Sequence, residues 1–525
     1  MAADLALAFD LGTGGCKASL YDVEGRCWGA HFAPYETRYP RPNWHEQRPR
    51  DWWDAVVLSA RALMRSSGAE SAAVRCIGLS GFSLGMVSLD RRGGLALEWV
   101  PIWSDSRPGD AELSAFFGEV EEEAWYARTG NGFPPGLYTV FKMMWLRGSN
   151  PELFSGIDRV LGSKDYINFL LTGVIATDFS YASGSGVYDL VDWAYSADLV
   201  AAAGMPLALF PEILPSTQVL GTLSRDAATA LGLSLDVQVV AGGVDNSCMA
   251  LGAGNLDDGS VYNSLGSSSW IAVTSRAPLI DFKRRPYVFA HVIPGLFNSA
   301  TAIFSAGSSH KWMVRELCRD LSREVVGDLS REVAGDELYA RVDELAGSAP
   351  IGSKGLLFNP SLAGGSSLDA SPKIRGAYIG LTLEHGRADV VRSTFEGISL
   401  GLADALDVLS SLTKVKGEMT LVGGGAKSAF WRQMLADVYG QTVRKTAIDE
   451  QAAALGAAAL SLVGSGYWNG FERISELHEE VEKSEPDPAA TLAYRRLLPL
   501  FRKAGEFLSY YGETIESIRR SSDRD

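Results

Sequence analysis

The stretch "FDLGTGGCKASLYD", residues 9–22, decides the fold, because its glycine-rich turn lies between two runs in which apolar residues alternate. Alternation with period two is typical of β-strands, so the pattern predicts a hairpin rather than a turn from a strand into a helix. Gly12, Gly14 and Gly15 permit the positive φ angles that a tight turn uses, and they let an oxygen atom approach the backbone. The turn is therefore a candidate phosphate cradle, with an ordinary hairpin turn as the alternative.

A second stretch repeats this pattern. In "YNSLGSSSWIAVTS", residues 262–275, an apolar run, a Leu-Gly-Ser turn at 265–268 and a second alternating run follow in the same order. A repeat at this distance indicates a duplicated domain, and two such hairpins form a clamp for a polyphosphate. We expect an N-terminal domain at 1–251 and a C-terminal domain at 252–525. Helical patterns such as 52–64 and 390–409 lie between the strands and indicate α/β layers.

Composition restricts the functional class. The chain has 525 residues, enough for two large domains, and a formal net charge of −15, which disfavours binding to nucleic acid. No apolar run approaches the roughly 18 residues of a membrane span. The first expected strand begins at Leu5, which leaves no room for a signal peptide, so we expect a cytoplasmic protein. Five scattered cysteines without a C-x-x-C pair indicate reduced thiols and no structural zinc site.

Two aspartates are candidates for chemistry. Asp10 lies just before the first turn, where its carboxylate would hold a hydrated Mg²⁺; the alternative is an exposed turn cap. In "VVAGGVDNSCMALGAG", Asp245 follows an apolar strand, and ligand sites of α/β folds gather at such strand ends. A carboxylate there can take the proton of a hydroxyl that attacks phosphorus, whereas the alternative reading is a helix N-cap.

Other glycine and repeat motifs are less specific. The chain contains neither G-x-x-x-x-G-K-[ST] nor G-x-G-x-x-G after a strand. In "LVGGGAKSAFWRQML", the turn at 423–426 would let a flat ring or a ribose lie on bare backbone, or it is a plain strand-to-helix connection. The tandem copy "DLSREVVGDLSREVAG", which starts at Asp320, is interpreted as a surface helical extension. We expect the charged tail after Gly512 to be frayed.

These segments together resemble the FGGY family of carbohydrate kinases, from about Leu5 to about Trp468. The resemblance implies a two-domain, duplicated α/β fold of the actin-like ATPase (ribonuclease H-like) type, with the active site in the interdomain cleft. The N-terminal signature of the family is kept in part, at Lys142, Trp145 and Leu146. The C-terminal signature is followed through "GAYIGLTLEHGRADVVRSTFEG", at Gly376, Tyr378, Gly380, Leu381, Asp389, Val390, Ser393 and Glu396.

The resemblance also implies ATP and Mg²⁺ as cofactors and assigns residues to them. Asp10 is similar to the carboxylate near Mg²⁺, and Asp245 is similar to the general base. The phosphate and adenosine sides correspond to Gly12, Thr13, Gly14, Lys17, Gly266, Ser267, Gly307, Lys311, Gly424, Gly425 and Ala426.

Within the family, four segments are most similar to xylulokinases: "HEQRPRDWW", "PIWSDSRP", "GSKDYINFLLTG" and "ATDFSYASGSGVYDL". The expected reaction is phosphorylation of a hydroxyl of a small sugar, with a ketopentose such as xylulose as the first candidate. One departure affects the substrate, because "GFSLG" has Leu84 where xylulokinases carry a histidine that would bind the sugar. The expected substrate side is Phe82, Ser83, Leu84, Trp103, Asp105, Asp245 and Asn246.

Several alternatives stay open at this point. Another ketose, a polyol or a sugar acid, of the ribulose, erythritol or gluconate type, is an alternative substrate. Outside the kinases, an actin-like nucleotide-switched interaction protein is the alternative, although Asp245-Asn246 and the segment from Trp103 to Arg107 argue against it. A homodimer is also compatible with the sequence.

Overall fold

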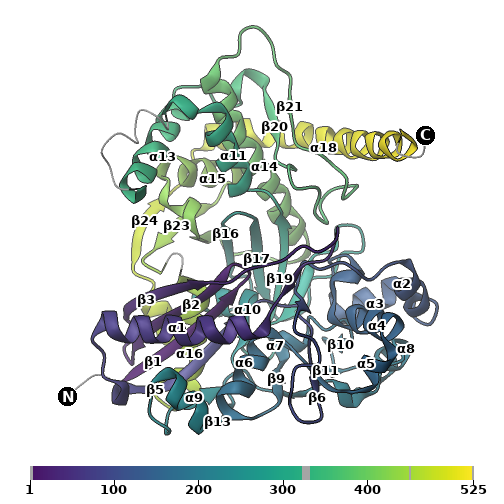
Figure 1. The fold of residues 1–525 in the computed structure, drawn as a ribbon. Coiled ribbons are helices and arrows are strands. Elements are labelled where there is room, and N and C mark those ends of the chain that lie inside the picture. The colour runs from purple at the N-terminus through teal and green to yellow at the C-terminus, as the bar shows by residue number, and fades with distance from the viewer. Residues whose placement is uncertain (1–3, 322–330, 449–450, 523–525) are drawn as a thin grey trace. The chain divides into compact units, whose positions relative to one another are not determined.

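The computed structural model describes residues 4–321, 331–448 and 451–522. They form two compact units, and the chain passes from one unit to the other more than once (Figure 1). The first unit contains residues 1–258, 274–299 and 451–478, and the second contains residues 259–273, 300–450 and 479–525. The expected boundary at Leu251 lies in the last turn of helix α10 (Asp245–Gly252).

A mixed β-sheet forms the centre of the first unit, with the strand order β13-β14-β5-β1-β2-β3. Strand β1 (Leu5–Gly12) pairs antiparallel with β2 (Gly15–Asp22) and parallel with β5 (Val74–Gly81), so the hairpin predicted at 9–22 is confirmed. The other strands are β3 (Cys27–Pro34), β14 (Gln238–Val240) and β13 (Val219–Thr222). A short strand, β15 (Gly243–Val244), also pairs parallel with β5.

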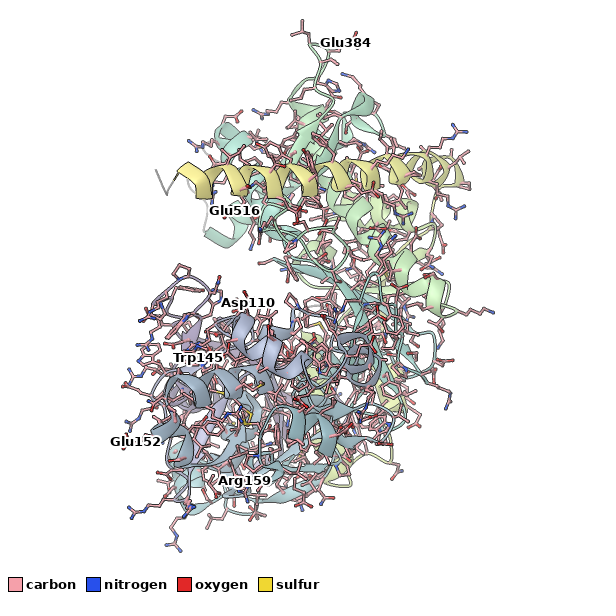
Figure 2. The ribbon with its side chains drawn as sticks, turned by 90° about the vertical axis from the view of Figure 1, so that its right-hand side faces the viewer. Asp110, Trp145, Glu152, Arg159, Glu384 and Glu516 are labelled. Carbon is pink, nitrogen blue, oxygen red and sulfur yellow. The ribbon has the colours of Figure 1, made fainter. Side chains whose placement is uncertain are left out.

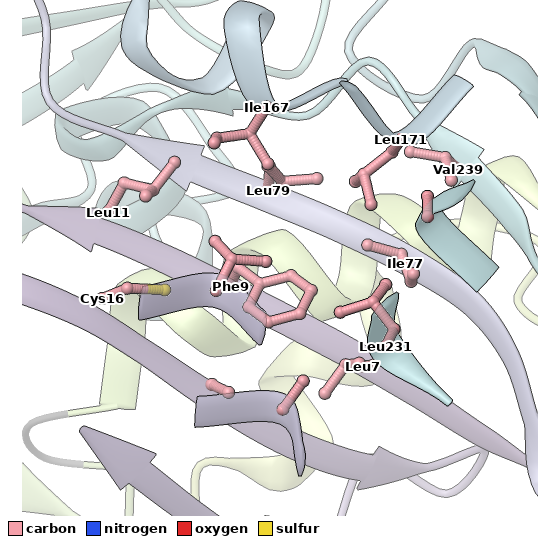
Figure 3. Close-up of a cluster of buried hydrophobic side chains, with 14 of the residues drawn as sticks. Leu7, Phe9, Leu11, Cys16, Ile77, Leu79, Ile167, Leu171, Leu231 and Val239 are labelled. Atoms are coloured by element: carbon pink, nitrogen blue, oxygen red, sulfur yellow. The ribbon is translucent and has the colours of Figure 1, made fainter. Parts of the chain in front are cut away.

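The two faces of this sheet are packed differently. On one face, alternate residues of β1 and β5 enter a fully buried apolar cluster with Phe9 at its centre (Figure 3). On the other, Gly78 of β5 allows close approach of α16 (Ala452–Gly464), because a Cβ at Gly78 would lie 1.9 Å from the Ala457 carbonyl oxygen. Helix α1 (Pro49–Ser67) contains the predicted helix 52–64; it begins at a proline and ends before Gly68, whose φ is 67°.

The remaining elements of the first unit are short. They are β4 (Glu46–Gln47), β6 (Val87–Asp90), β7 (Val100–Pro101), α2 (Asp110–Phe117), α3 (Glu122–Thr129), α4 (Thr139–Ser149), α5 (Pro151–Ser155), β8 (Ile157–Leu161), α6 (Ser163–Thr172), β9 (Ala176–Asp178), α7 (Phe179–Ala182), β10 (Tyr188–Asp189), β11 (Ala194–Tyr195), α8 (Ala197–Ala202), β12 (Glu212–Leu214), α9 (Arg225–Leu231), β18 (Tyr287–Ala290) and α17 (Glu472–Leu477).

The sheet of the second unit repeats the arrangement of the first. Its order is β18-β19-β17-β16-β22-β23-β24; besides β18, it consists of β19 (Phe297–Ile303), β17 (Ser269–Ser275), β16 (Val261–Leu265), β22 (Glu418–Val422), β23 (Thr442–Thr446) and β24 (Glu480–Ser484). As with β1, β16 pairs antiparallel with the next strand of its hairpin and parallel with β22. Two α/β sheets with one topology confirm the repeat inferred from residues 262–275.

Long helices cover the second unit. They are α11 (Gly307–Leu317), α13 (Arg331–Gly347), α14 (Arg387–Leu412), α15 (Ala429–Tyr439) and α18 (Pro488–Ser522), and the short strands β20 (Leu357–Asn359) and β21 (Ala377–Ile379) complete it. Helix α14 contains the predicted helix 390–409. Its buried Glu396 accepts hydrogen bonds from the Gly352 N–H, the Ser353 hydroxyl and the Arg392 guanidinium, each at 2.8 Å. A residue of the C-terminal signature therefore holds an interior turn.

Two expectations about irregular segments have different outcomes. The tail after Gly512 was expected to be frayed, but α18 continues to Ser522, so that expectation is wrong. Of the tandem copy, residues 322–330 lie outside the described residues, and helix α13 begins at Arg331 within the second copy.

The described residues also bear on cysteines and membranes. All five cysteines are free; Cys27 is exposed and the other four are buried. Within the described part of the chain, no helix combines the length and apolar character that a membrane span requires.

Candidate active site

Three of the predicted segments begin where neighbouring strands of the first sheet end. Because β1, β5 and β15 run parallel, their carboxyl ends meet, and the register aligns Leu11 with Gly81 and Gly81 with Val244. The residues that follow these positions are the first hairpin turn, the "GFSLG" loop and Asp245. The structure thus brings together the segments of the first unit that are expected to bind phosphate, to bind the substrate and to carry the base, at the strand ends where ligand sites of α/β folds gather.

The backbone of the first hairpin turn is held by its carbonyl groups. The Gly12 carbonyl accepts a hydrogen bond from the Tyr35 hydroxyl, the Thr13 carbonyl accepts one from Gln47 Nε2 at 2.7 Å, and the Gly14 carbonyl accepts one from the Tyr35 N–H at 3.3 Å. The N–H groups of Thr13 and Gly14 have no hydrogen-bond partner among the residues that the structure describes. A turn with engaged carbonyls and unengaged N–H groups can receive an anion.

The reason for the glycines differs from the one expected. None of the glycines at 12, 14 and 15 has a positive φ, so the expectation of left-handed turn residues is wrong. Gly15 is required by packing, since a Cβ there would lie 2.4 Å from the Phe32 ring and 2.5 Å from the Ala33 carbonyl oxygen. A Cβ at Gly14 would meet no described atom within 4 Å, which leaves that side of the turn open to a ligand.

Asp10 and Lys17 lie opposite each other on the two strands of the hairpin. The Ser80 hydroxyl donates to Asp10 Oδ1 at 2.9 Å, so Asp10 has an interior partner and is not the exposed turn cap of the alternative reading. Burial raises the pKa of the Asp10 carboxyl above its ordinary value, while the Ser80 hydrogen bond and the Lys17 charge lower it. A cation beside this carboxylate would offset the cost of burying its charge.

Asp245 is the first residue of α10, and its side chain is half-buried. Burial, and next the negative charge of Asp10, together raise the pKa of its carboxyl to about 7. The N-cap residue of α10 is Val244, and Asp245 Oδ1 accepts from the adjacent Asn246 N–H at 2.8 Å, so the N-cap alternative is wrong. A carboxyl with this pKa can accept a proton near neutral pH.

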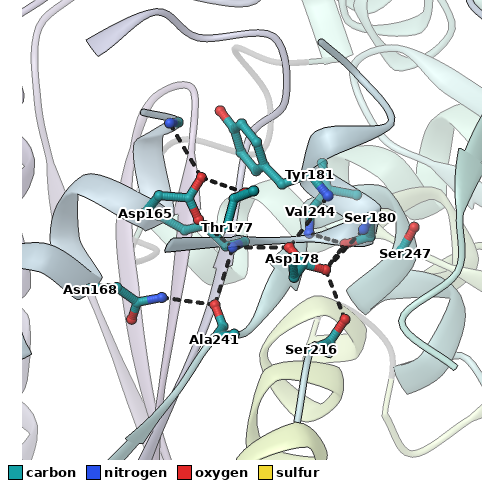
Figure 4. A network of polar contacts seen from close by, with 12 residues as sticks. Asp165, Asn168, Thr177, Asp178, Ser180, Tyr181, Ser216, Ala241, Val244 and Ser247 are labelled. Atoms are coloured by element: carbon teal, nitrogen blue, oxygen red, sulfur yellow. Dashed lines mark hydrogen bonds and ion pairs between the residues drawn. The ribbon is translucent and has the colours of Figure 1, made fainter. Parts of the chain in front are cut away.

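A buried polar network fixes the strand end before Asp245 (Figure 4). The Val244 N–H donates to the Ser180 hydroxyl at 2.9 Å, and that hydroxyl donates to Asp178 Oδ2 at 2.5 Å. The buried Lys164 ammonium bridges Asp165 Oδ1, at 2.5 Å, and Asp178 Oδ1, at 3.0 Å. The segments "GSKDYINFLLTG" and "ATDFSYASGSGVYDL" therefore support the position of the candidate base.

The side chains of the "GFSLG" loop are buried. Phe82, Ser83 and Leu84 are 2%, 7% and 1% exposed. Leu84 has a φ of 58°, and its side chain lies in an apolar cluster with Met86. The buried ammonium of Lys142 donates to the Leu84 carbonyl at 2.8 Å. The side chain of Leu84 has no polar group that could bind a sugar, and its backbone carbonyl is bound by Lys142.

The loop that contains Trp103 and Asp105 connects to the first hairpin. Trp103 Nε1 donates to Thr13 Oγ1 at 2.8 Å. Asp105 is fully buried: its two oxygens accept from the Arg107 guanidinium at 2.8 and 2.7 Å, and the His45 N–H donates to Oδ2 at 2.8 Å. Asp105 therefore holds this loop together, whereas Trp103 is only partly buried beside the hairpin. Asn246, the last expected substrate residue, is half-buried beside Asp245.

The second hairpin turn is held in the same way as the first. The Ser267 carbonyl accepts from the N–H groups of Ala306 and Ser308 at 3.1 and 3.0 Å, and the Gly266 carbonyl accepts from the Gly307 N–H at 2.9 Å. Gly307 begins α11, and a Cβ there would lie 2.4 Å from the Gly266 carbonyl oxygen. The glycine is thus needed to place the N-terminus of a helix, which favours anions, against the turn.

A cavity of about 780 Å³ opens beside this second turn, and all its lining residues belong to the second unit. Six of the predicted adenosine and phosphate residues line it: Gly266, Ser267, Gly307, Lys311, Gly424 and Gly425. Ala426 is buried and is not one of the lining residues. The register pairs Ser264 of β16 with Val422 of the parallel strand β22. The second hairpin turn and the glycine turn at 423–426 therefore begin at the same end of the sheet, as the corresponding segments do in the first unit.

The sequence analysis did not find the aromatic wall of this cavity. His310 stacks on Tyr339 with ring centroids 5.5 Å apart and contacts Phe395 and Trp431 at 4.7 and 5.2 Å. Burial lowers the pKa of the His310 imidazole to about 4, so the ring is neutral at pH 7. Neutral aromatic rings around a cavity suit a flat base. His310 lies between the predicted residues Gly307 and Lys311, and Trp431 lies within "LVGGGAKSAFWRQML", but Tyr339 has no sequence signal.

The described residues contain no group of three or more His, Cys, Asp or Glu side chains that would enclose a metal ion. Mg²⁺ usually keeps several waters and is held by one or two carboxylates together with phosphate oxygens. The half-buried Asp10 and the neighbouring Asp245 carboxyl fit that mode of binding, which needs no closed cage of protein ligands.

Comparison with known proteins defines the class. Models of the FGGY family of carbohydrate kinases match residues 5–252 with the N-terminal domain and residues 261–465 with the C-terminal domain. The chain therefore belongs to this family; it is a carbohydrate kinase with the duplicated actin-like α/β fold.

Individual relatives are distant but cover most of the chain. Xylulose kinase of Escherichia coli (strain K12) is 30% identical over 500 residues, which are 95% of this chain and 98% of the relative. Xylulose kinase of Bacillus subtilis (strain 168) is 28% identical over 98% of this chain and 99% of its own. The crystal structure of xylulose kinase from Rhodospirillum rubrum has a TM-score of 0.85 at 29% identity and covers 97% of this chain and 100% of that one.

Proposed function

We propose that the protein transfers the γ-phosphoryl group of ATP to a hydroxyl of a ketopentose such as xylulose, with Mg²⁺ as the metal ion. The observation that carries the proposal is the Asp245 carboxyl, whose pKa of about 7 suits a general base and which follows the strand beside the "GFSLG" loop. The similarity to xylulose kinases over more than nine tenths of the chain supports the choice of sugar.

Each group has a role in this proposal. Asp245 takes the proton of the attacking hydroxyl, and the N–H groups of Thr13 and Gly14, with Lys17, hold phosphoryl oxygens. In the second unit, Ser267 and Lys311 hold the remaining phosphates, and the aromatic wall of the cavity receives the base of ATP. Asp10 is the residue that would hold Mg²⁺, which when bound would neutralise phosphate charge.

We also propose where the enzyme acts and what it does not bind. Its substrate ATP is supplied in the cytoplasm, so the enzyme works there. The net charge of −15 makes a polyanionic partner such as nucleic acid unfavourable.

Leu84 favours a second candidate, a kinase for another ketose, polyol or sugar acid. Its side chain is buried among apolar residues, so a sugar hydroxyl directed toward it would lose a hydrogen bond, at a cost of roughly 1–3 kcal/mol. We therefore expect xylulose to be used less efficiently than a compound that is shorter, deoxygenated or differently configured at that carbon.

A substrate panel tests both candidates. Purified protein is assayed for ADP formation with xylulose, ribulose, erythritol and gluconate, and kcat/KM is compared. Turnover that a sugar raises above background is the expected result; no stimulation by any compound would favour a nucleotide-switched interaction protein. If xylulose exceeds every other compound by tenfold or more, the inference from Leu84 is wrong.

We further propose that two copies associate through α18. Four exposed apolar residues follow one stripe of this helix: Leu500, Phe507, Tyr511 and Ile518, with exposures of 52%, 63%, 46% and 53%. Figure 2 shows the helix with Glu516 labelled. Antiparallel pairing about the midpoint of the stripe would bring Lys503 of one copy within a turn of Glu513 of the other, twice by symmetry. This charge match favours a second copy as the partner.

A further inference from the structure

The hydrogen bond between Trp103 and Thr13 restricts what the Thr13 hydroxyl can do. Trp103 Nε1 lies 2.8 Å from Thr13 Oγ1, and an indole nitrogen is only a donor. The Thr13 oxygen is therefore the acceptor, so its single hydrogen remains available for another partner. Thr13 is exposed at the tip of the hairpin, beside the open side of Gly14.

The direction of the indole N–H is set by the interior of the first unit. The Trp103 ring is partly buried and packs against two apolar clusters. The preceding residue is held twice, because the Ile102 carbonyl accepts from Lys142 Nζ at 2.7 Å and the Ile102 N–H donates to the His45 carbonyl at 3.0 Å. A ring fixed by packing and by its backbone offers its N–H in one direction.

Thr13 is held a second time through its backbone. The Thr13 carbonyl accepts from Gln47 Nε2 at 2.7 Å, and Gln47 is fully buried. Gln47 Oε1 accepts from Trp52 Nε1 at 2.8 Å, which fixes the orientation of the amide because an indole cannot accept a hydrogen bond. Two tryptophan N–H groups thus determine both the backbone and the side-chain orientation of one exposed threonine.

We propose that Trp103 is a positioning residue for phosphoryl transfer: by donating to Thr13 Oγ1, it directs the Thr13 hydroxyl hydrogen toward an oxygen of the transferred phosphoryl group. This inference rests on the proposed function, in which the first hairpin receives the phosphates. The same hydrogen bond would make phosphate binding depend on the substrate, because a substrate that displaces the Trp103 indole from Thr13 would weaken phosphate binding. A polar contact thereby connects the loop on the substrate side to the phosphate turn.

A double-mutant cycle tests the proposal. Trp103→Phe keeps an aromatic ring and removes the N–H, Thr13→Val keeps the shape and removes the hydroxyl, and Thr13→Ser keeps the hydroxyl. We expect Trp103→Phe to lower kcat by about three- to tenfold with the KM of the sugar changed less than twofold, and Thr13→Ser to keep most of the activity that Thr13→Val loses. In the Thr13→Val background, Trp103→Phe should lower kcat less than twofold, because the indole acts through the hydroxyl.

Matched measurements separate this inference from the proposed function. Trp99→Phe is the control, since Trp99 stacks under the Arg38 guanidinium at 4.0 Å and should leave kcat unchanged. The indole N–H resonance of Trp103, assigned by its absence in Trp103→Phe, should shift in Thr13→Val whether or not any sugar is phosphorylated. An unshifted resonance, equal effects of Trp103→Phe in both backgrounds, or a change in sugar KM alone would each overturn the positioning role. Absence of kinase activity in the wild type would count against the proposed function instead.

Discussion

At the scale of single residues, the site depends on carboxyl groups in an environment that disfavours their charge. Burial raises the pKa of both Asp10 and Asp245, and the Asp10 charge adds to the shift at Asp245. Such pairs are common where proteins trade stability for chemistry. Two consequences can be measured, one for turnover and one for stability.

Asp245→Asn should lower turnover by at least about 10²-fold, because an amide cannot take the proton of the attacking hydroxyl. ATP binding should change little, since the cavity of the second unit contains no atom of Asp245. Steady-state rates and nucleotide titration check the two statements. Asp90→Asn, which removes a carboxyl outside the site, is the control, and near-normal turnover of Asp245→Asn would refute the assignment.

The same substitution should raise stability at alkaline pH. The folded-state pKa of Asp245 is about 7, above its ordinary value, so its contribution is favourable at low pH and is lost as pH rises through about 7. Asp245→Asn removes that loss. The Tm of the variant should therefore exceed the Tm of the wild type at pH 8, and this Tm difference should be much smaller at pH 5. Backbone hydrogen bonds from Gly94 and Arg92 lower the pKa of Asp90, so Asp90→Asn should have the opposite sign. Equal Tm differences for Asp245→Asn at both pH values would contradict the shift.

At the scale of elements, helix α4 connects the two loops that are proposed to bind the substrate. Its buried Lys142 ammonium donates to the carbonyls of Leu84 and Ile102, at 2.8 and 2.7 Å, and burial lowers its pKa to about 7. A lysine can make these two hydrogen bonds in either protonation state. The signature lysine thus acts on the backbone of the "GFSLG" loop and on the residue before Trp103.

Lys142→Met should leave both carbonyls without this donor and loosen both loops. We expect the unfolding free energy to fall by about 3 kcal/mol and kcat/KM for the sugar to fall by about tenfold or more, with a much smaller change in the KM for ATP. Denaturant unfolding and steady-state kinetics provide the measurements. Lys414→Met, at an exposed position of the second unit, should change neither quantity. If the KM for the sugar stays constant while the KM for ATP rises, Lys142 acts on nucleotide binding and the expected effect on the sugar is wrong.

Sequence patterns predicted the secondary-structure elements well, but they predicted less well why particular residues are needed at particular positions. The alternation in residues 9–22 and the position of Asp245 after a strand gave the hairpin and the candidate base, because both signals are local. Gly15 is needed for contact with the Phe32 ring of the next strand, and Gly512 for contact between α18 and Lys373, whose carbonyl oxygen would lie 1.9 Å from a Cβ. Local pattern cannot reveal such distant contacts, and the same is true of the aromatic wall made by His310, Tyr339 and Trp431.

At the scale of the whole molecule, the exposed stripe of α18 bears on self-association. Its apolar residues repeat at 500, 507, 511 and 518, a spacing that keeps them on one side of the helix. Most exposed large apolar residues elsewhere on the chain stand singly, as is usual for soluble proteins. A row of four along one helix is unusual unless a partner covers it.

Phe507→Glu combined with Tyr511→Glu should convert a dimer into a monomer, because four carboxylates would meet across the antiparallel pair. Light scattering after size-exclusion chromatography measures the mass of each variant at equal concentration. Leu207→Glu, at an exposed residue of the first unit, is the control. If the wild type has the mass of one chain, or if the double variant keeps the mass of two, α18 is not the interface.

The repeated passage of the chain between its units has a consequence for synthesis on the ribosome. Helix α16 belongs to the first unit and packs on β5. It lies in the last segment of that unit, which ends at residue 478, about 220 residues after the first segment ends at residue 258. At roughly 5–20 residues per second, the sheet of the first unit waits roughly 10 to 40 s for the helix that covers it. During that interval the small residues that α16 will contact, such as Gly78, have no cover from this helix. Nascent chains of this protein should therefore need chaperones that shield an unfinished sheet, and a fragment that ends at residue 251 should not be able to fold by itself.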